Sequence, residues 1–238
     1  MRLINLGCSF SYGNQISEYE KFANQHISPG TLLSRHLNCE EYNIASPGLS
    51  LDGVLRRLYT FEFNNEDVFL VGLPPNVRLQ YVSISPRNQN KIRQSDPSGK
   101  GPSEYRNHAF NQGPKIPDDW FKTLRWDIDI DIKKMDVIET TAYHSFFYIL
   151  LIQNFLKDKR HWLYNSVHGH MQLDSTKSEI QKLKQQIILD NYFKPNIGMH
   201  DEILQDTKYQ IARDDTHPNH KYYNKWIEEF CEWMLQSV

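Results

Sequence analysis

The sequence predicts an α/β fold, a three-layer α/β/α sandwich with a central, mostly parallel sheet of about five strands. Three observations predict it. Short apolar runs alternate along the chain with segments of helical spacing. The runs are apolar throughout rather than at every second residue, which is typical of strands that are covered on both faces. The chain closes with apolar residues at three-and-four spacing, as in a helix packed on a sheet.

The first expected element is a buried strand at 3–6, after which Gly7 allows a sharp turn. The next expected elements are helices at 31–37 and 51–63 and strands at 42–45 and 68–72. The second half of the chain predicts helices at 143–157 and 178–189, a strand at 161–165, an irregular stretch at 194–213 and a last helix from about Asn219. The last helix is expected to pack on the sheet through an apolar stripe of Tyr223, Trp226, Ile227, Phe230 and Met234.

A proline-rich stretch interrupts this rhythm. The segment from Pro74 to Pro117 holds seven of the eleven prolines, so it predicts an insertion or lid, at about 74–135, within a single domain that spans 1–238. Between Arg78 and Lys115 it carries seven basic residues against two acidic ones. We expect it to favour an anionic or heavily hydroxylated substrate, with Arg78 and Arg87 as substrate-binding residues. An ordinary solvated loop is the alternative.

The composition excludes several classes of function. The 27 Lys and Arg nearly balance the 29 Asp and Glu, so general attraction to nucleic acid or to a membrane surface is not expected. Three distant cysteines suit a reducing compartment rather than a disulfide framework or a zinc site. Because no signal peptide or membrane-spanning run is evident, we expect a protein that is cytoplasmic in the producing cell, or virion-associated if phage-encoded. The oligomeric state is left open.

Two segments near the ends of the chain carry the groups of a serine hydrolase. Gly7, Cys8 and Ser9 follow the first strand, and Asp214 and His217 precede the last helix. A serine hydroxyl becomes a nucleophile when a histidine takes its proton, and a carboxylate orients that histidine. Ligands of open α/β sheets bind at the carboxyl ends of the strands. We therefore expect Ser9, His217 and Asp214 to meet there.

Each of these groups has an alternative. Ser9 alone would be taken for a turn or capping serine, and Ser11 is a rival nucleophile. Asp215 competes with Asp214 as the partner of His217. Cys8 offers a thiol nucleophile, but a residue adjacent to Ser9 on an extended segment points to the opposite side, so an inert buried thiol is the expected outcome.

The order and spacing of these residues resemble the SGNH (GDSL-like) hydrolase family. Gly7, Ser9 and Gly13 match its first signature, and Asp214 and His217 match its last. Cys8 replaces the acidic residue that usually precedes the serine. The resemblance implies a flavodoxin-like fold, a catalytic triad of Ser9, Asp214 and His217, and no metal or organic cofactor.

The two middle signatures of the family concern the oxyanion hole. The segment 43–48 resembles one of them, with Gly48 as a backbone donor. The other is broken, because Pro74 stands where the family has an asparagine, and proline has neither an N–H nor a side-chain donor. The resemblance then implies an oxyanion hole made of Ser9 and Gly48, with Asn76 reaching in from two residues later.

The resemblance implies a serine ester hydrolase, and the first expectation is an acetyl ester of a carbohydrate, ahead of a lipid ester or a thioester. The small size, the many asparagines and lysines and the missing signal suit a phage-type member. Pro74 supports an alternative, an inactive glycan-binding or virion structural module. A second alternative is a metal-dependent phosphoesterase that uses His168 and His170 with Asp174 nearby.

Overall fold

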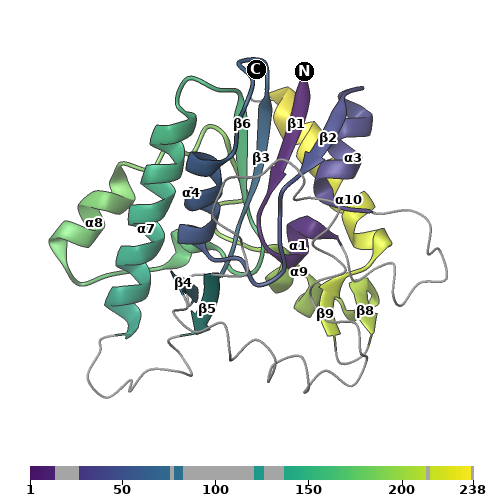
Figure 1. Cartoon of the computed structure of the whole chain (residues 1–238). Coiled ribbons are helices and arrows are strands. Elements are labelled where there is room, and N and C mark those ends of the chain that lie inside the picture. The colour runs from purple at the N-terminus through teal and green to yellow at the C-terminus, as the bar shows by residue number, and fades with distance from the viewer. Residues whose placement is uncertain (14–26, 76–77, 83–120, 126–136, 213–214, 237–238) are drawn as a thin grey trace, which may run out of the picture.

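The structure is a computed structural model that describes residues 1–13, 27–75, 78–82, 121–125, 137–212 and 215–236. Its centre is a five-stranded sheet with the order β2-β1-β3-β6-β7, in which each strand pairs in parallel with its neighbours (Figure 1). The strands are β1 (Arg2–Leu6), β2 (Glu40–Asn43), β3 (Val68–Leu73), β6 (His161–Asn165) and β7 (Tyr192–Phe193). The predicted α/β fold is confirmed.

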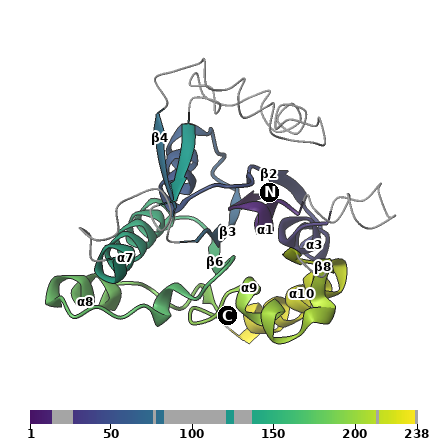
Figure 2. The ribbon, with the colours of Figure 1, turned by 90° about the horizontal axis from the view of Figure 1, so that it is seen from below.

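Helices cover both faces of this sheet. The helices α4 (Leu51–Thr60) and α7 (Val137–Leu156) lie on one face, with α8 (Ser178–Gln185) outside α7. The opposite face is covered by α3 (Pro29–His36) and α10 (His220–Gln236) (Figures 1 and 2). None of the described helices is long and apolar enough to cross a membrane.

Burial explains why these segments form these elements. All six residues of β3 are buried, and β1 and β6 are buried except at their first residues, as expected for strands between two helix layers. The helix α10 buries Tyr223, Trp226, Phe230 and Met234, which are four residues of its predicted stripe. Ring contacts join α10 to the sheet, because the ring of Trp226 lies 4.8 Å from that of Tyr164 in β6.

Several predicted boundaries were wrong. The strand β2 begins at Glu40 instead of 42, because it is an edge strand with no fully buried residue and no apolar run to mark it. The helix α4 ends three residues before the predicted 63, α7 begins six residues before the predicted 143, and α8 ends four residues before the predicted 189.

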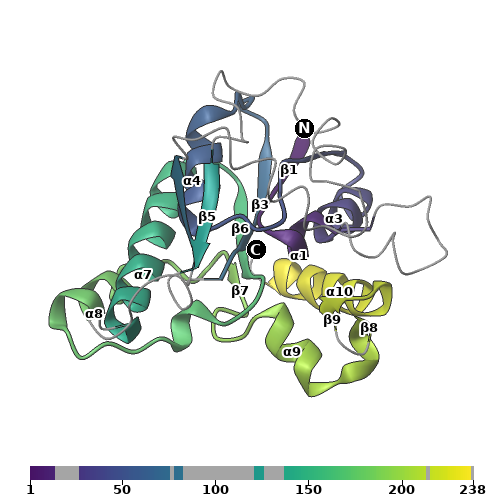
Figure 3. The ribbon, with the colours of Figure 1, turned by 60° about the horizontal axis from the view of Figure 1, so that its bottom comes forward.

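The stretch 194–213, predicted to be irregular, contains the helix α9 (Met199–Gln205), the 3₁₀ helix η5 (Thr207–Tyr209) and the strand β8 (Gln210–Ala212). The strand β9 (Asp215–Pro218) pairs with β8 in an antiparallel hairpin. Together with α1 (Ser9–Tyr12), α9 and this hairpin lie at the carboxyl ends of the sheet strands (Figure 3).

The segment 74–135, predicted to be an insertion or lid, is described in part. It contains β4 (Arg78–Val82) and β5 (Phe121–Arg125), which pair as an antiparallel ribbon separate from the central sheet. Residues 83–120 and 126–136 lie outside the described residues. The proline-rich stretch therefore contains regular structure at its start, and of the strands described in the segment neither joins the central sheet.

Candidate active site

Ser9 begins α1, directly after the turn that ends β1. Gly7 makes this turn possible, because its φ is 142° and a Cβ there would lie 2.0 Å from Ser11 Oγ and 2.6 Å from the carbonyl oxygen of Gly72. A Cβ on Gly72 would likewise lie 2.1 Å from Ser11 Oγ. Both glycines thus make room for the side chain of Ser11. The turn places Ser9, two residues earlier, at the carboxyl end of the sheet.

Buried hydrogen bonds from the sheet and from α10 hold this turn in place. Tyr164 donates its hydroxyl to Ser11 Oγ at 2.7 Å, and Asn5 donates from its side-chain amide to the Ser11 carbonyl at 2.9 Å. Tyr223 of α10 donates to the carbonyl of Phe10 at 2.7 Å. Burial raises the pKa of Tyr164 and of Tyr223, so both phenols remain protonated donors.

Burial separates the three candidate nucleophiles. Ser11 is fully buried and its hydroxyl is bonded to Tyr164, whereas Ser9 is only partly buried. Cys8, between the turn glycine and Ser9, is also fully buried, with a free thiol. Of the three, Ser9 is the one whose side chain a substrate reaches without rearrangement of the core.

His217 is held by the β8–β9 hairpin and by the start of α10. Asn219 anchors this segment, because its side-chain amide donates to the carbonyls of Lys208 at 2.8 Å and Gln210 at 3.1 Å. The side-chain oxygen of Asn219 accepts from the backbone N–H of Tyr222 at 3.1 Å, so it caps α10. His217 therefore leads into a helix whose position is fixed by the core.

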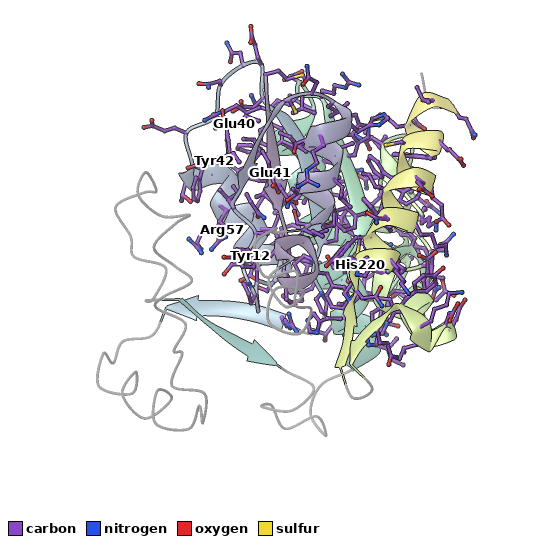
Figure 4. The ribbon with its side chains drawn as sticks, turned by 90° about the vertical axis from the view of Figure 1, so that its right-hand side faces the viewer. Tyr12, Glu40, Glu41, Tyr42, Arg57 and His220 are labelled. Carbon is purple, nitrogen blue, oxygen red and sulfur yellow. The ribbon has the colours of Figure 1, made fainter. Side chains whose placement is uncertain are left out.

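The segment that carries Ser9 and the segment that carries His217 meet at the carboxyl end of the sheet. Ser9 Oγ lies 3.0 Å from Nε2 of His217, and the Phe10 ring lies against the His217 ring with 4.8 Å between centroids. In Figure 4, Tyr12 at the end of α1 and His220 at the start of α10 lie at the same height of the molecule. With the serine hydroxyl as donor, the His217 ring carries its proton on Nδ1, where a carboxylate would accept it.

The remaining predicted site residues are described in part. Asp214, Asn76 and Arg87 lie outside the described residues, and of Asp215 the structure describes the backbone in β9. Arg78 is the first residue of β4. The roles predicted for these residues in binding and catalysis stay predictions.

Gly48, the expected second oxyanion donor, lies in a loop that contacts the turn before Ser9. The backbone N–H of Ser46 donates to the carbonyl of Gly7 at 2.9 Å, which ties this loop to the segment before Ser9. Gly48 has a φ of 78°, and a Cβ there would meet no heavy atom within 4 Å. The space in the direction of a Cβ on Gly48 is therefore open.

Pro74 and His170 form a buried pair that the sequence did not predict. His170 is 1 % exposed, and its Nε2 donates to the Pro74 carbonyl at 3.0 Å. Burial lowers the pKa of His170 to about 4, so the ring is neutral. The hydrogen bond to Pro74 uses Nε2 of His170, and His170 is not part of the metal-ligating group found among the described residues. A metal bound by His168 and His170 stays a prediction. Asp174 forms an ion pair with Lys184 at 2.9 Å.

His168 has other neighbours that sequence reasoning missed. Its Nδ1 lies 2.6 Å from Oδ1 of Asp201, and its ring lies 5.4 Å from that of His200. Burial, followed by the charge of His168, lowers the pKa of His200. The adjacent His200 and Asp201 were a signal in the sequence, but they fall in the stretch predicted to be irregular.

No protein-family model and no curated protein matches the sequence. Among solved structures it is similar to LAE5, described as an α/β hydrolase enzyme from the metagenome of Lake Arreo, Spain, with 14 % identity, a TM-score of 0.50 and coverage of 98 % of this chain and 94 % of that chain. It is also similar to a carbohydrate esterase with described divergent catalytic and non-catalytic binding functions, with 11 % identity, a TM-score of 0.45 and coverage of 99 % and 68 %. A third is the acetyl xylan esterase Est2A from the rumen bacterium Butyrivibrio proteoclasticus, with 12 % identity, a TM-score of 0.43 and coverage of 100 % and 65 %. The likeness to LAE5, at 14 % identity, shows the fold alone.

Proposed function

We propose that the protein is a serine ester hydrolase that works through an acyl-enzyme intermediate. The observation that carries the proposal is the 3.0 Å contact between Ser9 Oγ and Nε2 of His217. A hydroxyl and an imidazole within hydrogen-bond reach are what nucleophilic catalysis by serine requires. The pair lies at the carboxyl end of a parallel sheet, where ligands of open α/β sheets bind.

In the proposed reaction, His217 removes the proton of Ser9 while Oγ attacks the carbonyl carbon of the ester. Asp214 orients His217 and stabilises its charged form. His217 then gives the proton to the leaving alcohol, and the acyl group stays on Ser9. A water molecule, deprotonated by His217, then attacks this acyl ester, and His217 returns the proton to Oγ of Ser9 as the acid leaves.

The proposed oxyanion donors are the backbone N–H groups of Ser9 and Gly48, with the side chain of Asn76. Ser9 begins α1, and the first amides of a helix have no acceptor within the helix. Pro74 supplies no donor. Since one oxyanion donor is typically worth about 2.7 to 4 kcal/mol, an imperfect replacement by Asn76 would give a slow enzyme rather than an inactive one.

We further propose that the chain is a phage-type member of the SGNH family and that the substrate is an acetyl ester of a carbohydrate. The resemblance of its motifs supports the family, and the basic insertion with Arg78 and Arg87 supports a heavily hydroxylated or anionic alcohol. Neutralising Arg87, Lys91 and Arg93 together should raise KM for an acetylated oligosaccharide and leave hydrolysis of p-nitrophenyl acetate unchanged. Equal effects on both substrates would contradict this choice.

The experiment that tests the reaction is acetate release from acetylated oligosaccharides and from p-nitrophenyl acetate. Ser9→Ala should lower kcat by at least about 10⁴-fold, as loss of a catalytic serine typically does. Ser34→Ala is the matched control, because the Ser34 hydroxyl donates within α3 to the Thr31 carbonyl at 2.9 Å. Activity that survives in Ser9→Ala would refute the serine mechanism.

Pro74 favours one other function, that of a glycan-binding module without turnover. Proline has no side-chain donor, and the Pro74 carbonyl already accepts from buried His170 at 3.0 Å, so Pro74 itself cannot replace the asparagine of the family. If the protein is such a module, the wild type and Ser9→Ala would bind the acetylated glycan with equal affinity. Neither protein would release acetate.

A further inference from the structure

A cluster of three metal-ligating side chains lies at the carboxyl end of the sheet, apart from Ser9 and His217. His168 follows β6, and His200 and Asp201 lie in the first turn of α9. One ring nitrogen of each histidine and one carboxylate oxygen lie within 4.8 Å of one another. Among the described residues this is the one group of three or more such side chains that could hold a metal ion. The closest pair is His168 Nδ1 and Asp201 Oδ1, at 2.6 Å.

The backbone holds the two segments of the cluster together without intervening side chains. A Cβ on Gly169 would lie 2.1 Å from the Asn196 backbone, and a Cβ on Gly198 would lie 2.1 Å from the Val167 carbonyl. The side-chain amide of Asn165 donates to three carbonyls of the loop before α9, those of Lys194, Pro195 and Ile197. His168 is thus brought to α9 by contacts that do not depend on the cluster itself.

The carboxylate of Asp201 is oriented for binding. Its Oδ2 accepts from the backbone N–H of Gly198 at 3.0 Å, so Oδ1 is the oxygen turned towards His168. Hydrogen bonds to the second oxygen of a liganding carboxylate are typical of metal sites. The rings of His168 and His200 stand at 88° to each other, so they approach the cluster from different directions.

His200 also has an unsatisfied polar atom. Its Nδ1 is buried and has no hydrogen-bond partner among the described residues. Buried polar atoms of proteins are nearly always paired, and a cation bound at this nitrogen would satisfy it. Two imidazoles and one carboxylate are a ligand set that Zn²⁺ accepts, with a fourth position for water.

We propose that His168, His200 and Asp201 form a binding site for a divalent transition metal, with Zn²⁺ as the preferred ion. The bound ion ties the loop after β6 to the first turn of α9. The Phe10 ring lies near both sites, 6.2 Å from the ring of His200 and 4.8 Å from that of His217, and neither Ser9 nor His217 belongs to the cluster. The proposal is independent of ester hydrolysis.

The test is titration of the chelator-treated full chain with Zn²⁺ in a calorimeter. We expect one ion per chain and a rise in melting temperature on binding. His168→Ala and His200→Ala should each weaken binding by more than about 100-fold, since even changes outside the ligand shell cost about 10- to 100-fold. Cobalt, used in place of zinc, should give the intense visible absorption of a four-coordinate ion.

Two control variants sharpen the test. Asp174→Asn removes an exposed carboxylate that also follows β6 but pairs with Lys184, and His36→Ala removes an exposed histidine at the end of α3. Both should bind Zn²⁺ as the wild type does. The His168 side chain is 56 % exposed, so its removal should leave folding intact even if His200→Ala fails to fold. Binding that survives in His168→Ala, or no binding by the folded wild type, overturns the proposal.

Ser9→Ala separates this proposal from the serine mechanism. The variant should bind Zn²⁺ as the wild type does, because Ser9 is not among the ligands. Failure of acetate release would therefore leave the metal site standing, and failure of metal binding would leave the serine mechanism standing. A loss of zinc binding in Ser9→Ala contradicts the ligand set proposed here.

Discussion

The carboxyl and amino ends of the central sheet contain similar hydrogen bonds with different consequences. At the carboxyl end, Tyr164 and Tyr223 donate to the turn that carries Ser9. At the amino end, the Arg2 guanidinium donates to both oxygens of Asp67, at 3.0 and 2.7 Å, and joins the start of β1 to the residue before β3. Both sets stabilise the fold, but only the first holds the proposed nucleophile and its proposed base in position. Changes at the first end should alter activity, and changes at the second should alter stability alone.

The largest effect is expected for His217. His217→Ala should lower kcat for ester hydrolysis by at least about 10⁴-fold, because Ser9 loses the base that takes its proton. The double variant with Ser9→Ala should be no slower than either single one, since residues that act as a unit are not additive. Initial rates on p-nitrophenyl acetate measure this. If the fold-decrease in kcat of the double variant equals the product of the two single fold-decreases, Ser9 and His217 have independent roles.

A smaller effect is expected when the hydrogen bond from Tyr223 of α10 to the Phe10 carbonyl, next to Ser9, is removed. Tyr223→Phe should lower kcat about 10-fold, because small misplacements of reacting groups are costly. It should also lower the free energy of unfolding by about 1 kcal/mol, since it leaves the Phe10 carbonyl unpaired.

Tyr222→Phe is the matched control for this prediction. Tyr222 is the neighbouring residue in α10, is equally buried, and donates to Glu202 at 2.6 Å instead of to the turn. The free energy of unfolding of Tyr222→Phe, measured in urea, should fall by a comparable amount, but its kcat should be unchanged. Equal losses of kcat in both variants would show that the turn has no special dependence on Tyr223.

The smallest effect on activity, none, is expected at the amino end. Burial alone would raise the pKa of Asp67, but the hydrogen bonds from Arg2 and from the Asn64 N–H lower it. A lowered carboxyl pKa stabilises the fold above the unfolded pKa of about 3.9, and this contribution is lost as the pH falls through the folded pKa.

Asp67→Asn should therefore lower the free energy of unfolding at pH 7 by about 1.5 to 3 kcal/mol, the usual range for hydrogen bonds to charged groups, and leave kcat unchanged. The difference from the wild type should shrink below about pH 4, where the wild type loses the same contribution. Urea unfolding at several pH values measures both. A constant difference across this range, or a fall in kcat, would contradict the division between the two ends.

The sequence was informative where burial is continuous and less so where structure depends on tertiary contacts. The strands β1, β3 and β6 lie within one residue of their predicted bounds, because each is an apolar run buried on both faces. The helix α9 was missed because it is seven residues long and buries only Met199 and Ile203, too little to mark a helical period.

The same contrast holds for the candidate site. The proximity of Ser9 and His217 was predicted from two motifs placed at the ends of predicted elements. Tyr164 and Tyr223 were not predicted as supports of the turn, because their hydrogen bonds span 153 and 213 residues. The approach of His168 to Asp201 depends on two glycine contacts between loops, which no local pattern indicates.

The most direct measurement is labelling of the folded protein with a fluorophosphonate, followed by mass-spectrometric mapping of the modified residue. The account predicts one adduct, on Ser9, that disappears in Ser9→Ala and is strongly slowed in His217→Ala. An adduct on Ser11, or no adduct on the folded wild type, would contradict the claim that Ser9 and His217 form a nucleophile and its base.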